Sequence, residues 1–342
     1  MQRITTKDTQ ESARRTWDEA KGVECIVPFD FTDASRRALR WAVSIARGAR
    51  VPMRIALVHA IEPTALGESD DFRALLEARG RERMLAECDG LAPRGARGGV
   101  AIVRECEVGD LVDLVRSRAG RAPRALVVVG DRGLGAVRRA ILGSATERLL
   151  RELECPMLVV RSEPERDAPP AVRAVLVATD FSRDAEAALE AAHLLCDAAT
   201  PVDGAVRVEF VHVVSPAPLL EVSERASLTA TPAQAPVPAP ELPPAEVAIA
   251  EAGIARALED AAQAFRAAAR AAGAEVEVAT RIEHGDLVRA LAHEADRTAA
   301  SVIVLGRHAV GMLERMLTGS TAERLVHATR RSVLTARAPA PR

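Results

Sequence analysis

The clearest chemical signal in the sequence is a run of spaced glycines: Gly130, Gly133 and the pair Gly143-Ser144. Glycine at the end of a strand can adopt positive φ and lets a ligand approach the backbone closely. A helix that starts at Gly143 would direct unpaired N–H groups and the positive end of its dipole back toward these glycines, and Ser144 would add a hydroxyl donor. The spacing therefore predicts a phosphate-binding segment (the first glycine segment, residues 130–144). A tight turn followed by a helix cap is the alternative.

A second glycine segment, residues 306–320, repeats this layout. It differs at Ala309, where the first segment has glycine; a Cβ there would obstruct a ligand, or cost about 1 kcal/mol if φ is positive. The first segment is not a Walker A sequence, because no Lys precedes Ser144, and it misses the dinucleotide-binding pattern at Arg138. We therefore expect the first segment to be the better site, and the second to bind weakly or not at all.

The repeat extends well beyond the glycines. Residues 25–46 align with 175–196, and residues 107–115 align with 283–291. These matches indicate a tandem duplication of one domain. The predicted organisation is a flexible N-terminal arm (1–21), a first domain (22–162), a linker (163–171) and a second domain (172–338) with a Pro/Ala-rich, mostly disordered insertion (215–246).

Within the first domain, short apolar runs alternate with longer stretches of helical periodicity. Runs that are apolar throughout and are separated by helices favour a parallel sheet covered on both faces. Each domain is therefore predicted to be an α/β, doubly wound sheet of five mostly parallel strands, with ligands at the carboxyl ends of the strands. Expected N-caps are Thr32 or Asp33, Asp110 and Ser144. The expected strands are 25–29, 55–60, 100–106, 125–129 and 157–160.

Composition excludes several classes of protein. The formal net charge is -2 with acids and bases interspersed, and aromatic residues make up 2% of the chain, with no tyrosine, so nucleic-acid binding by charge or by stacking is not expected. No stretch approaches the roughly 20 apolar residues of a membrane span, and the first residues lack the apolar core of a secretory signal. The five cysteines show no CxxC pair and are expected to be buried hydrophobes. We expect a cytosolic protein.

The spacing G-x2-G-x9-G-[ST] resembles the ATP-binding class of the universal stress protein family. The aspartates of "PFDFT" and "ATDFS", the "VHA" and "VHV" sequences and the "VGD" and "HGD" turns are similar to further motifs of that family, in the same order in both copies. The resemblance covers nearly everything from Glu24 to Arg337, apart from the linker and the insertion. It implies an adenine nucleotide alpha hydrolase-like fold that binds ATP, or AMP or ADP, with Mg²⁺ held by the phosphates.

The resemblance also implies which residues make contact. In that family the first-strand Asp and the backbone after the second-strand His contact adenine, whereas the glycines and the Gly-Ser helix start bind ribose and phosphates. Asp30 could instead cap the first helix, and we interpret His59 and His212 as strand histidines whose hydrogen bonds are satisfied. The implied contacts are Asp30, Ala60, Gly130, Gly133, Gly143, Ser144 and Ala145 in the first copy, and Asp180, Val213, Gly306, Gly319, Ser320 and Thr321 in the second.

No catalytic machinery accompanies these residues, since phosphoryl transfer needs a positioned base, a metal-holding carboxylate and a cationic clamp. Asp131 has no counterpart in the second copy, where Arg307 stands, and no His, Cys or Asp cluster has the spacing of a metal site. The resemblance implies a stress-response or signalling protein that acts as a nucleotide-dependent switch or protective module. The alternatives are an enzyme on a related fold (a ligase or an electron-transfer flavoprotein-like carrier), although "PFDFTDAS" lacks the glycines of a pyrophosphate loop, and a non-binding dimerisation module.

Two runs, residues 156–160 and 332–336, would each form an edge strand with unpaired backbone groups. Single domains of the resembled family commonly pair through this strand. Because both copies lie in one chain at high effective concentration, we expect the two edges to pair as an intramolecular pseudo-dimer, and a homodimer stays open.

Overall fold

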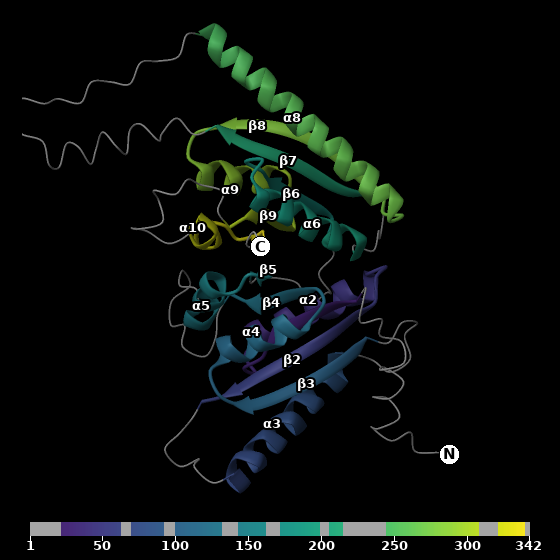
Figure 1. Cartoon of the computed structure of the whole chain (residues 1–342), viewed down its shortest axis with the longest axis vertical. Helices are drawn as coiled ribbons and strands as arrows, with labels where there is room; N and C mark the ends of the chain where they lie inside the picture. Colours follow the sequence, from purple (N-terminus) through teal and green to yellow (C-terminus); the bar gives the residue numbers. More distant parts are fainter. Residues whose placement is uncertain are drawn as a thin grey trace, which may run out of the picture.

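The described residues form one continuous sheet of ten strands in a computed structural model (Figure 1). The structure describes residues 22–62, 70–91, 100–131, 143–161, 172–198, 205–214, 244–307 and 321–338. The strand order is β3-β2-β1-β4-β5-β10-β9-β6-β7-β8. The strands are β1 (Val23–Pro28), β2 (Met53–Ile61), β3 (Ala101–Val108), β4 (Ala125–Gly130), β5 (Met157–Val160), β6 (Ala174–Ala178), β7 (Val206–Val214), β8 (Val276–His284), β9 (Val302–Gly306) and β10 (Ser332–Ala336).

Each half of the sheet has the doubly wound order that the repeats predict. In the first half, β1 pairs in parallel with both β2 and β4, and β4 pairs in parallel with β5. In the second half, β6 pairs in parallel with both β7 and β9, and β9 with β10. The predicted α/β class and the two five-stranded units are confirmed. We call residues 22–161 the first half and residues 172–338 the second half.

The two halves join through the last strand of each half, β5 and β10. β5 and β10 pair antiparallel, with Val159 opposite Val333 and Leu158 opposite Leu334. These are the two strands that the sequence marks as exposed edges. Because the pairing is antiparallel, the carboxyl ends of the parallel strands point to opposite edges of the sheet in the two halves.

Helices cover both faces of the sheet, and each face has one apolar core that extends through both halves. One core packs sheet residues such as Val27 and Leu334 against α2, α3, α6 and α8, and the other packs residues such as Ile26 and Val333 against α4, α5, α9 and α10. Alternate strand residues thus enter opposite cores, as the period of a strand requires. The helices are α2 (Asp33–Gly48), α3 (Asp70–Leu91), α4 (Leu111–Arg121), α5 (Ser144–Glu152), α6 (Arg183–Ala198), α8 (Pro244–Ala271), α9 (Leu287–Arg297) and α10 (Thr321–Ala328).

Two of the expected helix caps are correct and one is wrong. Thr32 caps α2 by accepting a hydrogen bond from the Ser35 N–H, and Asp110 caps α4. Ser144 is not the N-cap of α5 but its first helical residue, because the N-cap is Gly143. The cap position therefore lacks a side chain that could satisfy the first N–H groups of α5.

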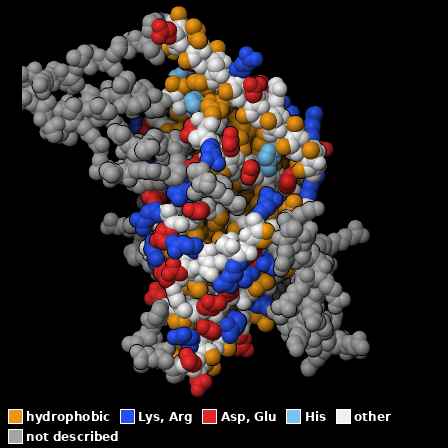
Figure 2. Space-filling view, in the orientation of Figure 1, with side chains coloured by type: hydrophobic (Ala, Val, Ile, Leu, Met, Phe, Trp, Pro, Cys, Tyr) orange, Lys and Arg blue, Asp and Glu red, His pale blue; other side chains and the backbone are white. Residues whose placement is uncertain are grey.

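Helix α8 is the longest helix among the described residues, at 28 residues, and it lies across the end of the second half (Figure 1). It begins at Pro244, a few residues before the expected end of the insertion. The rest of the insertion, the N-terminal arm and the linker lie outside the described residues. Ile249, in the first turns of α8, is 73% exposed, and Figure 2 shows apolar side chains along this helix, whereas acidic and basic side chains alternate over the first half.

Each half buries a glutamate against two arginines, which the sequence does not reveal. In the first half, Glu24 of β1 lies 2.5 Å from Arg54 Nε and 2.6 Å from Arg118 Nη2. In the second half, Glu294 of α9 lies 2.9 Å from Arg281 Nε, and hydrogen bonds from Arg297 hold the pKa of this carboxyl below its usual range. Such pairs offset the cost of burying a charge only when the partners are in place.

No helix among the described residues is long and apolar enough to cross a bilayer.

Candidate functional site

The first set of expected contacts meets at one edge of the sheet. β2, β1 and β4 are neighbours and parallel, so their carboxyl ends bring Ala60, Asp30 and Gly130 to the same edge. Helix α5 starts beside them, because the Gly143 N–H donates to the Asp131 carbonyl over 3.1 Å and the Thr146 hydroxyl donates to the Gly130 carbonyl over 3.1 Å. Gly133 lies outside the described residues.

Gly130 is required by packing against a helix rather than by positive φ. Positive φ values among the described glycines occur at Gly273 and Gly285, and not at Gly130. A Cβ at Gly130 would lie 2.6 Å from the backbone of Ala34, in the first turn of α2. A positive φ at Gly130 is therefore wrong as the reason for this glycine, which instead allows the strand to approach the helix closely. Gly306 is similar, since a Cβ there would lie 2.7 Å from the Asp184 backbone.

Gly130→Ala is expected to destabilise the protein by about 1–3 kcal/mol, because the added methyl group must displace the start of α2. Urea unfolding measures the change. The matched control is Gly120→Ala in α4, where an added Cβ has no atom within 4 Å; this variant is expected to stabilise by about 0.5–1 kcal/mol. Equal stabilities of the two variants would show that α2 gives way without cost.

The start of α5 has the donors that an anion needs. Gly143 makes no side-chain cap hydrogen bond, and Ser144, which follows it, is exposed. The first N–H groups of a helix have no intrahelical acceptor and carry the positive end of the dipole. The first intrahelical bond runs from the Glu147 N–H to the Gly143 carbonyl over 3.0 Å. The N–H groups of Ser144 and Ala145 therefore lie at the edge of the sheet where ligands of such folds bind.

Asp30 has a structural role in this structure. Its Oδ1 accepts hydrogen bonds from the Thr32 N–H (3.1 Å) and the Thr32 hydroxyl (2.5 Å), and Thr32 in turn caps α2. Asp180 accepts from the Ser182 N–H over 3.0 Å in the same way. The alternative that Asp30 caps α2 is therefore wrong, because Thr32 is the cap and Asp30 accepts hydrogen bonds from it. These hydrogen bonds hold the carboxyl groups at the ends of β1 and β6.

The residue after each aspartate is a phenylalanine in the left-handed region, with φ of 63° at Phe31 and 60° at Phe181. Residues other than glycine rarely adopt this backbone conformation, which costs roughly 1–2 kcal/mol. The centroid of the Phe31 ring is 4.8 Å from that of the His59 ring. The Cζ of Arg83 lies 3.9 Å from the centroid of the Phe31 ring. The Phe181 ring instead stacks on His212 at 5.3 Å. Neither phenylalanine is among the residues expected from the sequence, although the "DF" that follows both strands is a repeated signal.

The two histidines beside these rings are satisfied strand residues, as interpreted from the sequence. His59 Nδ1 lies 2.7 Å from the Phe29 carbonyl, and His212 Nδ1 lies 2.9 Å from the Thr179 carbonyl. Since a carbonyl only accepts, each Nδ1 must carry the proton. Each histidine therefore ties the end of the second strand of its half to the turn that carries the aspartate.

The second set of expected contacts meets at the opposite edge. β7, β6 and β9 place Val213, Asp180 and Gly306 at the carboxyl ends of adjacent parallel strands, and Thr321 is the first residue of α10. Gly319, Ser320 and the divergent Ala309 lie outside the described residues.

Reactive thiols and metal ligands are not found in the described parts of the chain. Burial raises the pKa of Cys25 and of Cys196 to about 12 and that of Cys106 to about 11, so these thiols stay protonated at neutral pH. Cys88 is buried as well. Among the described residues no three His, Cys, Asp or Glu side chains lie close enough together to hold a metal ion.

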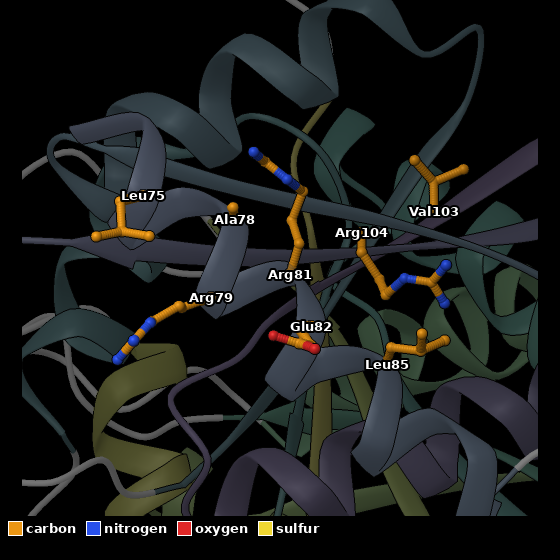
Figure 3. A pocket seen from close by; sticks show the side chains of 8 residues that line it. All are labelled: Leu75, Ala78, Arg79, Arg81, Glu82, Leu85, Val103 and Arg104. Carbon is orange, nitrogen blue, oxygen red and sulfur yellow. The ribbon is translucent and has the colours of Figure 1, made fainter. Parts of the chain in front are cut away.

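A shallow hollow of about 600 Å³ lies elsewhere, between α3 and the edge strand β3 (Figure 3). It is separated from β4 and α5 by β2 and β1, so it is not part of either set of expected contacts. Its lining is Leu75, Ala78, Arg79, Arg81, Glu82, Leu85, Val103 and Arg104.

Comparison with known proteins decides the family. The model of the universal stress protein family matches residues 24–161 and again residues 171–337. The chain belongs to this family, with two copies of its domain. A universal stress protein of Thermus aquaticus is 30% identical over 138 residues, which are 40% of this chain and 96% of that protein. One of Mycobacterium tuberculosis is 32% identical over 165 residues, which are 48% of this chain and 57% of that protein.

Solved structures support the tandem fold. The universal stress protein of Archaeoglobus fulgidus superimposes with a TM-score of 0.58 at 19% identity, covering 94% of this chain and 98% of that one. A universal stress protein of Pseudomonas aeruginosa gives a TM-score of 0.50 at 16% identity, with 92% of each chain covered. At these identities the likeness shows the fold of this tandem universal stress protein and not its ligand.

Proposed function

We propose that this tandem universal stress protein is a cytosolic stress-response or signalling module that binds an adenine nucleotide in its first half. ATP is the proposed ligand, with ADP or AMP as related occupants, and the bound nucleotide acts as a switch or as part of a protective module. The protein is proposed to bind the nucleotide without a dedicated catalytic step.

The observation that carries this proposal is the uncapped start of α5 beside the ends of β1 and β4. Its free N–H groups, at Ser144 and Ala145, match the chemistry of phosphate oxygens. Asp30 and the backbone at Ala60 lie at the ends of neighbouring strands, where they would receive the adenine. A bound Mg²⁺ would be held by the phosphates. The described part of the chain supplies no cluster of metal ligands at this edge.

The second half is proposed to bind more weakly or not at all. Ala309 adds a Cβ where the first segment has Gly133, and the residue after Gly306 is an arginine whose side chain is used in contacts with the first half. These observations favour a non-binding, structural role for this half.

Mass spectrometry of nucleotide released from the natively purified and then denatured protein tests the proposal. We expect adenine nucleotide, and calorimetry on the stripped protein should give a stoichiometry nearer one than two per chain. If the protein releases no nucleotide and calorimetry shows no binding heat, the non-binding dimerisation module replaces this proposal. Two equal sites would show that Ala309 is tolerated.

A further inference from the structure

Arg307 of the second half makes side-chain hydrogen bonds to the backbone of the first half. It is the first residue after β9, and it is only 5% exposed. Its N–H donates to the Ala336 carbonyl over 2.8 Å, which keeps its backbone against β10. Its guanidinium crosses the β5–β10 junction, where Nη1 donates to the Leu150 carbonyl over 3.2 Å and to the Leu153 carbonyl, and Nη2 donates to the Cys155 carbonyl over 2.7 Å.

These three carbonyls lie at the C-terminal end of α5 and just beyond it. The last carbonyls of a helix have no intrahelical donor and carry the negative end of its dipole, so a buried cation is the partner that they need. Burial lowers the pKa of Arg307 to about 10, and the guanidinium is still protonated at neutral pH. Its five N–H donors lie in one plane and span a wider set of acceptors than the three donors of an ammonium group.

The opposite end of the same helix forms the candidate phosphate site. α5 has nine residues, and at 1.5 Å of rise per residue it is a rod of roughly 13 Å. Its N-terminal end is held at β4 by the bonds from Gly143 and Thr146, and its C-terminal end is held by Arg307. A displacement at one end of so short a helix moves the other end as well.

The first half has no arginine at the position that corresponds to Arg307. The residue of the first half that corresponds to Arg307 is Asp131, which is 1% exposed. Its carboxylate lies 3.4 Å from Arg37 Nη2 and 3.5 Å from Arg161 Nη1, and both of these arginines belong to the first half. A carboxylate cannot donate to helix carbonyls. The first half therefore has no equivalent of the contact that Arg307 makes.

We propose that Arg307 is a positioning residue for the nucleotide site of the first half: by holding the C-terminal end of α5, the second half keeps the N–H groups of Ser144 and Ala145 in place. This inference rests on the proposed function, and it assigns to the second half a role in the binding of the first.

The test compares Arg307→Met with Arg50→Met in the full chain. Arg50 is a matched control because its Nη1 donates to the Ala272 carbonyl over 2.9 Å, so that it also caps a helix end across the halves, but it caps α8 and does not touch α5. We expect Arg307→Met to increase hydrogen exchange at Glu147 to Leu150 by about 10-fold or more, which reports local opening of α5. Arg50→Met should leave these amides unchanged.

ATP affinity is the second measurement, made well below the midpoint of thermal unfolding. Arg307→Met should weaken binding by about 5-fold to 150-fold, the usual range of coupling between sites, and Arg50→Met should not. Arg307→Lys keeps the charge but reaches fewer carbonyls, so its ATP affinity should lie between that of the native chain and that of Arg307→Met. If Arg307→Met does not fold, Arg307→Lys takes its place in both measurements.

The outcomes separate the two proposals. Unchanged exchange in α5 would overturn the role of Arg307, whether or not nucleotide binds. If Arg307→Met increases exchange in α5 but leaves the ATP affinity unchanged, Arg307 is not a positioning residue. The same conclusion follows if Arg50→Met loses as much ATP affinity as Arg307→Met. Increased exchange in a protein whose native form binds no nucleotide would support the contact with α5 and contradict the proposed function.

Discussion

Ser144→Asp is expected to reduce ATP affinity by at least about 100-fold. The new carboxylate would lie at the first turn of α5, where the phosphates are proposed to bind, and two like charges 4 Å apart repel by about 4 kcal/mol at the dielectric of a protein surface. An acidic residue at this position favours the helix itself, by about 0.3–1 kcal/mol. Loss of binding would therefore not come from loss of folding. Isothermal titration calorimetry measures the affinity.

Two control variants distinguish the effect of a charge at position 144 from the effect of side-chain shape and from the effect of an added charge elsewhere in the protein. Ser144→Asn has nearly the same shape as Ser144→Asp and no charge, so it should weaken binding much less. Ser117→Asp adds the same charge on the exposed face of α4, toward the far end of that helix, and should leave the affinity near its native value. If Ser144→Asp binds ATP as the native protein does, the phosphates do not lie at the start of α5.

Val159→Pro is expected to break the junction between the halves. The Pro156 carbonyl accepts from Val127 of β4, and the Val160 carbonyl accepts from Asp131, just after β4. The backbone of Val159 therefore faces β10, where Val333 is its partner. Proline removes this N–H, and its ring clashes with the neighbouring strand. Together with the unpaired carbonyl of the partner, the cost should exceed about 3 kcal/mol. Each half keeps its own parallel ladder, so the two should unfold in separate steps.

Tryptophan fluorescence and far-UV circular dichroism report this separation. The chain has two tryptophans, and in a Trp17→Phe background Trp41 of α2 reports on the first half alone, whereas dichroism reports on both halves. The urea transitions should coincide in the native chain and differ in Val159→Pro. Val159→Ala, which keeps the N–H, should lower the midpoint and leave the transitions coincident. Coincident transitions at an unchanged midpoint in Val159→Pro would show that side-chain packing alone holds the halves together.

Much of the fold could be predicted from the sequence because it depends on local periodicity. The run 157–160 was predicted with the same bounds as β5, since it is apolar throughout and follows a proline. β1 begins two residues before its predicted start, at Val23. Glu24 lies in this added part, and the arginines at positions 54 and 118, brought in by β2 and α4, make its burial tolerable.

The candidate site was predicted less completely. The structure places Gly130 and the start of α5 at one edge of the sheet, as expected, but the reasons for two of these residues differ. Ser144 follows the cap and does not form it, because Gly143 has the extended conformation of an N-cap and the helix begins after it. Gly130 makes room for α2, a contact with Ala34 that no spacing along the chain could reveal.

By itself the sequence determined the duplication, the parallel five-stranded units and the edge at which each set of expected contacts lies, because hydrophobic period and strand order follow from near neighbours and from repetition. Only the tertiary structure decided how the halves differ in use. The antiparallel pairing of β5 with β10 turns the two sets to opposite edges, and it brings Arg307 of the second half to the end of a helix in the first. In the sequence this residue was merely an arginine where the other copy has Asp131. The difference acquires meaning only when distant segments fold together, because a buried guanidinium must find acceptors wherever the fold supplies them.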